Sequence, residues 1–121
     1  MKIELTMGRY LPDIHLFHSR RKCKRFIERH GCAFNPLDGK DAQTWYLSKP
    51  GDSKAVILME RNGDWHGDAA LLAHEAVHVA LDVCGQLGLE GQEAVAYIAG
   101  EVSGLLFAAH EKWKREHGDT E

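Results

Sequence analysis

Two long helical segments dominate the second half of the chain, and they constrain the fold more than any other sequence feature. Apolar spacing predicts a helix over residues 69–84, with Asp68 as its N-cap and Gly85 at its end. A last helix is predicted over residues 91–116, after a glycine-rich connection at 85–88. The helix over 69–84 is apolar nearly all round, so we expect it to be buried.

The first half is predicted to supply a small sheet. Residues that favour β-structure predict four short strands, at residues 1–6, 13–18, 44–47 and 55–59. The last two are expected to form a hairpin whose loop of five or six residues includes the turn at 49–53. Ser19 is predicted to cap a helix that runs to about His30 and stops at Gly31. This order of elements predicts an α+β fold, with a small, mainly antiparallel sheet packed on helices.

Size and charge exclude several classes of protein. A chain of 121 residues is predicted to form one domain, spanning residues 1–121. The net charge of −3 gives no global attraction to nucleic acid or to anionic membranes. Because no apolar stretch is long enough and the N-terminus lacks an apolar segment, neither a transmembrane helix nor a signal peptide is expected. Three cysteines without a CxxC pair exclude a disulfide framework and favour the cytoplasm.

The helix over residues 69–84 contains a His-Glu-x-x-His motif, at His74, Glu75 and His78. Histidines at positions i and i+4 lie on one face of a helix, so both imidazoles can bind the same metal ion. Glu75 follows the first ligand and can activate a zinc-bound water by taking its proton. The alternative is that the two histidines hydrogen-bond to the backbone or to each other.

A catalytic zinc normally takes three protein ligands and a water. The longer pattern HExxHxxGxxH is absent, because Leu81 and Cys84 occupy its glycine and third histidine positions. The acids downstream of the motif are Asp82, Glu90, Glu93 and Glu101. If the two helices pack antiparallel, the depth of Glu93 roughly matches that of His78, so Glu93 is the preferred third ligand. Asp82 is better placed to support His78 as a hydrogen-bond acceptor.

The motif, together with the segment Glu93-Ala94-Val95-Ala96-Tyr97, resembles the gluzincin metallopeptidases. The similarity covers roughly residues 43–110 and is greatest to the minimal gluzincins, many of which are encoded by phages and prophages. The resemblance implies a minimal zincin-like core and one zinc ion, bound by His74, His78 and Glu93, with Glu75 as general base. It also implies that a peptide lies along the edge of a preceding strand, expected at residues 55–59. The chain is too short for the second subdomain of larger members.

Further side chains could contribute to this site. Tyr97 lies one turn after Glu93, where its hydroxyl could hold a ligand or stabilise an oxyanion; the alternative is a core tyrosine. His66 could reach the cleft from just before the metal helix, or could be an exposed loop histidine. His110 and His117 are expected at the surface. The three cysteines are expected to be small core or boundary residues.

The sequence therefore predicts a cytoplasmic zinc metallopeptidase that hydrolyses peptide or protein substrates in a bacterial or phage-infected cell. It does not define the oligomeric state, and no membrane partner is expected. One alternative is a non-catalytic, zinc-stabilised interaction module. Another is a nucleic-acid binder that uses the basic run at residues 20–25, although the negative net charge disfavours nucleic acid and a solvated helix face is the commoner explanation.

Overall fold

A computed structural model describes residues 2–3, 13–36, 41–49, 52–60, 64–88 and 91–117. The elements follow in the order β1 (Lys2–Ile3), β2 (Asp13–Phe17), α1 (Arg20–Arg29), β3 (Ala42–Lys49), β4 (Asp52–Met59), α2 (Trp65–Leu87) and α3 (Gln92–His117). The α+β prediction is confirmed. Within the described part of the chain, no helix is both long and apolar enough to cross a membrane.

The sheet is mixed, with the strand order β1-β2-β4-β3. Strand β2 pairs in parallel with β4, whereas β1 with β2 and β3 with β4 are antiparallel. The predicted hairpin is confirmed, but its strands are longer than expected and the last pair joins Lys49 to Asp52. Only residues 50 and 51, which lie outside the described residues, separate the two strands. The predicted loop of five or six residues was therefore too long.

The position of β4 corrects the expected substrate edge. Strand β4 lies between β2 and β3, so both of its edges are paired. Among the described strands, β3 is the outer one on this side, and its far edge faces no other strand. Residues 55–59 therefore cannot offer a free edge, and the candidate edge moves to the other strand of the hairpin.

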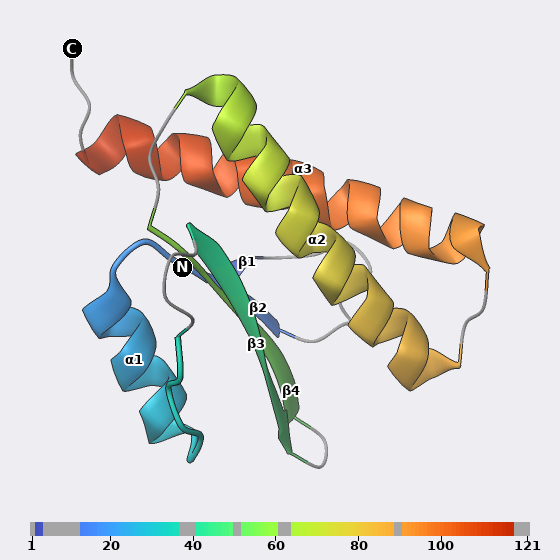
Figure 1. Cartoon of the computed structure of the whole chain (residues 1–121), viewed down its shortest axis with the longest axis horizontal. Coiled ribbons are helices and arrows are strands. Elements are labelled where there is room, and N and C mark those ends of the chain that lie inside the picture. The colour runs from blue at the N-terminus through green and yellow to red at the C-terminus, as the bar shows by residue number, and fades with distance from the viewer. Residues whose placement is uncertain are drawn as a thin grey trace.

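Helices cover both faces of the sheet, with α1 on one side and the long helices α2 and α3 on the other (Figure 1). Side chains alternate along a strand, so each strand contributes to two cores. On β4, Ala55, Ile57 and Met59 pack toward α2 and α3. Val56 and Leu58 pack instead with Cys23 and Ile27 of α1. The sheet is thus the middle layer of three.

Local sequence signals determine the ends of α1 as predicted. The Ser19 hydroxyl accepts a hydrogen bond from the backbone N–H of Lys22 at 3.3 Å, and the helix ends at Arg29 with His30 as its C-cap. Gly31 follows with a φ of 80°, a conformation that favours glycine. Cys23 is fully buried beneath this helix, and burial raises the pKa of its thiol to about 12.

Helix α2 is longer than predicted at both ends. Its N-cap is Asp64, whose carboxylate accepts from the Gly67 N–H at 2.6 Å, and not Asp68. Its C-cap is Gly88, with a φ of 70°, and not Gly85. Asp68 is instead fully buried and pairs with α3. Two acids four residues apart offer the same capping signal, and only tertiary packing distinguishes them.

Candidate functional site

His74 and His78 lie on an exposed face of α2, and their rings approach each other at an angle of 76°. Their Nε2 atoms are 3.2 Å apart. Two nitrogens bound to one tetrahedral zinc at about 2.0–2.1 Å lie roughly 3.3 Å from each other. The observed spacing therefore suits two adjacent ligand positions. It also suits a hydrogen bond in which one neutral ring donates to the other, the alternative expected from the sequence.

Glu75 turns away from this exposed face, and its side chain is buried against the sheet. The residue is 4% exposed, and its Oε1 accepts a hydrogen bond of 2.5 Å from the Thr44 hydroxyl on β3. A hydroxyl bond to a carboxylate is among the stronger hydrogen bonds in proteins and orients the carboxylate. Sequence reasoning missed Thr44. The available signal was strand alternation, which places Thr44 on the same face of β3 as the buried Ala42.

Tyr46 shares that face of β3 and adds a phenol close to the two acids of α2. Its pKa is raised to about 12, mainly by burial and also by the negative charges of Asp82 and Glu75. The hydroxyl therefore stays protonated at neutral pH and can donate a hydrogen bond. The side chain still has 41% of its surface exposed. Tyr46 was likewise missed from the sequence, where it appeared only as a strand residue.

The structure does not bring the other predicted site residues to the histidine pair. Glu93 is exposed in the first turn of α3, and Tyr97 is 66% exposed one turn further on. Among the described residues, no three His, Cys, Asp or Glu side chains lie close enough to share a metal ion. In Figure 1 the last turns of α2 and the first turns of α3 lie apart, in agreement with this finding.

The remaining candidates have other surroundings. Asp82 accepts a hydrogen bond of 2.7 Å from Gln86. Glu90 lies outside the described residues. His66 is exposed within the first turn of α2 and contacts Trp65 edge to face. None of these side chains is placed beside the histidine pair by a described contact.

The expectation that α2 is buried all round was wrong. Val77 is 43% exposed and Leu81 is 54% exposed, on the same side as the two histidines. The opposite side, which includes Leu72, Ala76, Val79 and Val83, is buried in the core. The helix is therefore half covered, because the sheet and α3 pack on one side only. His74 and His78 are accessible from solvent.

A second polar cluster joins the start of α2 to the end of α3. Asp68 and His110 are both fully buried, and His110 Nε2–H donates to Asp68 Oδ2 at 2.9 Å. His18, at the end of β2, lies with its Nε2 2.8 Å from His110 Nδ1. The Lys114 ammonium is 3.8 Å from Asp68 Oδ2. The prediction that His110 lies at the surface was therefore wrong, because a buried carboxylate from another helix is its partner.

The titration of His18 provides a test of this cluster. The pKa of His18 is lowered from 6.5 to about 4, mainly by burial and also by the neighbouring His110 and His117, against an opposing effect of Asp68. Between pH 6.5 and 4 the unfolded chain binds a proton at this position that the folded chain does not, so stability falls as the pH falls. We expect the urea midpoint to drop across this window, and to drop less in His18→Gln. NMR titration showing His18 protonated near pH 6.5 would contradict the assignment.

The basic run is an exposed face of α1. Arg20 forms a two-pronged ion pair with Glu60, at 2.6 and 3.0 Å, while Arg21, Lys22, Lys24 and Arg25 are exposed. The Arg20 guanidinium lowers the pKa of Glu60 through this hydrogen bond. Arg20 is therefore engaged in an ion pair within the protein.

Comparison with known proteins identifies no relative: no family model, curated protein or solved structure matches the chain. The residues of the site are consequently the basis for any functional conclusion.

Proposed function

We propose that the chain is a zinc-dependent metallopeptidase. The observation that carries the proposal is the 3.2 Å spacing of the His74 and His78 Nε2 atoms. Its support is the adjacent Glu75, a carboxylate held by Thr44 at the inner side of the same helix. Two neutral imidazoles at this spacing are a donor set that zinc prefers, and a neighbouring carboxylate supplies the base that peptide hydrolysis needs.

Each residue of the site has a separate role in the proposed reaction. Zinc, when bound, would polarise a peptide carbonyl and make a water more acidic. Glu75 would be the base that takes a proton from the attacking water and returns it to the leaving amine. Its Oε1 is engaged by Thr44, so Oε2, which has no hydrogen-bond partner among the described residues, is the oxygen available for proton transfer. The protonated Tyr46 phenol is a candidate donor to a developing oxyanion.

The outer edge of β3 is the proposed position of the substrate backbone. This strand contributes both Thr44 and Tyr46 toward α2, and its far edge is unpaired among the described strands. A peptide that added to this edge as a strand would run beside β3, the strand that carries Thr44 and Tyr46. The exposed Val77 and Leu81 would line the same approach.

The third ligand remains a prediction, with Glu93 as the proposed residue. Glu93 lies in the first turn of α3, next to the connection from α2. If no third side chain joins, the alternative of a non-catalytic zinc-stabilised module becomes the better description.

Zinc binding tests the proposal directly. We expect the purified chain to bind one zinc ion, and His74→Ala or His78→Ala to lose it, because each substitution removes one of two adjacent ligands. Glu93→Gln should weaken zinc binding by about 10–100-fold. The measurements are metal content after dialysis and competition with a chromogenic chelator.

His66→Ala is the matched control, because it removes an exposed histidine of the same helix. It should leave zinc binding unchanged. A wild-type chain that binds no stoichiometric zinc would overturn the proposal. If Glu93→Gln bound zinc with unchanged affinity, His74 and His78 would remain the proposed ligands and Glu93 would be rejected as the third ligand.

A further inference from the structure

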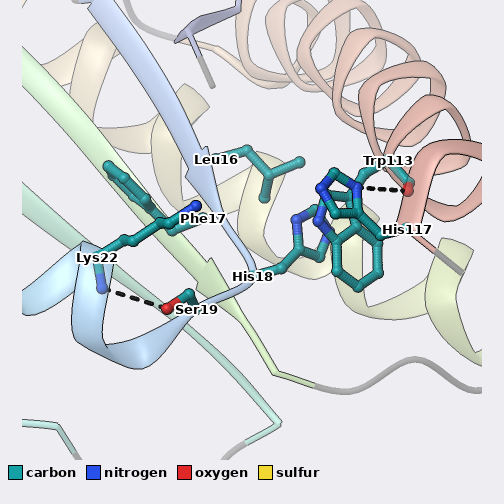
Figure 2. Close-up of a pocket in the computed structure, with 7 residues that line it drawn as sticks. All are labelled: Leu16, Phe17, His18, Ser19, Lys22, Trp113 and His117. Atoms are coloured by element: carbon teal, nitrogen blue, oxygen red, sulfur yellow. Dashed lines mark hydrogen bonds between the residues drawn. The ribbon is translucent and has the colours of Figure 1, made fainter.

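A separate pocket lies where β2 and the start of α1 meet the end of α3. Its volume is about 360 Å³, within the range of small-ligand pockets. The residues that line it are Leu16, Phe17, His18, Ser19, Lys22, Trp113 and His117. Figure 2 shows Phe17 and Lys22 on one side, and His18, Trp113 and His117 on the other. None of these residues belongs to the proposed zinc site.

The orientation of His18 is set from inside the protein. The Asp68 carboxylate can only accept, so His110 Nε2 carries the proton of their 2.9 Å bond. The 2.8 Å contact between His18 Nε2 and His110 Nδ1 is a hydrogen bond in the tautomer in which His18 Nε2–H donates and His110 Nδ1 accepts. His18 Nδ1 is therefore left as an acceptor, and it has no partner among the described residues. The buried pair thus defines which hydrogen-bonding group His18 can present at the pocket.

The stacked rings hold this imidazole in place. His18 stacks on Trp113 with a centroid distance of 3.8 Å and an interplanar angle of 7°. His117 stacks on Trp113 with a centroid distance of 5.3 Å, and its Nδ1–H donates a hydrogen bond to the Trp113 carbonyl at 3.1 Å. These rings, with Leu16 and Phe17, form an apolar and aromatic wall. Such walls favour flat, apolar ligand groups.

The charge of the pocket is positive on the side of α1. Lys22 is the only lysine or arginine that lines it, and no aspartate or glutamate lines it within the described part of the chain. No acidic side chain pairs with Lys22 among the described residues. The backbone N–H groups of the first turn of α1 lie beside Ser19 and add to the positive potential. A ligand with an anionic group would therefore complement the positive charge on this side of the pocket.

We propose that this pocket binds a small aromatic organic anion that also carries a hydrogen-bond donor. The acidic group lies at Lys22, the ring lies against the wall of Phe17, Leu16 and Trp113, and the donor points to His18 Nδ1. A carboxylate and a phosphate ester share this chemistry, so both are tested.

Indole-3-acetate and adenosine monophosphate are suitable probes, because each combines a flat ring, an N–H donor and an anionic group. We expect at least one to bind with a dissociation constant of about 1 mM or lower, measured by calorimetry. The side-chain N–H signal of Trp113 should shift in NMR spectra. A preference for one probe identifies the anionic group, and failure of both probes to bind would overturn the proposal.

Matched probes and variants separate the contributions. Indole-3-acetamide, which lacks the charge, should bind roughly tenfold more weakly, and Lys22→Gln should cause a similar loss for the acetate. Lys24→Gln, on the same helix but outside the pocket, should have no effect. Indole-3-acetate that is methylated at the ring nitrogen lacks the N–H donor and should bind the wild type more weakly than indole-3-acetate does. This difference between the two compounds should disappear in His18→Phe. Equal binding of acid and amide would contradict the role of Lys22.

Discussion

Glu75→Gln is expected to reduce peptide hydrolysis by about 10²–10⁴-fold while zinc remains bound. Glutamine has nearly the same shape and can still accept the hydrogen bond from Thr44, so the fold should be retained. What it cannot do is take a proton from water at neutral pH. The measurement is the rate of cleavage of a broad peptide mixture by the zinc-loaded protein, with circular dichroism to confirm folding.

Two variants sharpen this prediction. Asp82→Asn removes a different carboxylate of α2, one that bonds to Gln86, and should change the rate by less than about threefold. Thr44→Val leaves Glu75 in place without its hydroxyl partner and should give an intermediate loss. If Glu75→Gln retained the wild-type rate, Glu75 would not be the base. If the zinc-loaded wild type cleaved nothing, the chain would be better described as a zinc-stabilised module.

Asp68→Ala is expected to destabilise the protein by about 3–5 kcal/mol, a large part of the roughly 5–15 kcal/mol typical of a whole domain. The substitution leaves the fully buried His110 without its acceptor and removes the negative charge near Lys114. A buried polar group without a partner costs more than the lost bond itself. Urea denaturation should show the loss as a lower midpoint, with thermal unfolding at a temperature lower by roughly 10–20 °C.

Asp64→Ala is the matched control, since Asp64 lies one turn earlier and its carboxylate caps the helix. Its loss should cost about 1 kcal/mol. Replacing Asp68 and His110 together by leucine should recover much of the stability lost in Asp68→Ala, because no buried polar group then remains unpaired. Equal losses in Asp64→Ala and Asp68→Ala would mean that the buried pair contributes little.

Features that depend on nearby residues could be predicted from the sequence. The cap at Ser19, the glycine stop at Gly31 and the hairpin follow from side-chain chemistry within a few residues. The same is true of the histidine pair, because helix geometry alone places positions 74 and 78 on one face.

Features that depend on packing between distant segments could not be predicted. The bond from Thr44 to Glu75 spans 31 residues, and that from Asp68 to His110 spans 42. Each requires the relative placement of whole elements. The reach of Glu93 depends on the angle between α2 and α3, and the assumed close antiparallel pair does not hold near the connection (Figure 1). The substrate edge was misplaced for a related reason, because strand order is not encoded in strand sequence.

The alternation along β4 has a consequence for how the sequence can change. Ala55, Ile57 and Met59 belong to one core, and Val56 and Leu58 belong to the other. Among the described residues, the two clusters have no residue in common. A change in volume under α1 can therefore be compensated by its own neighbours without disturbing the helices that carry His74 and Glu75. We expect substitutions on the two sides of β4 to be nearly additive in stability, so that the two layers can diverge independently.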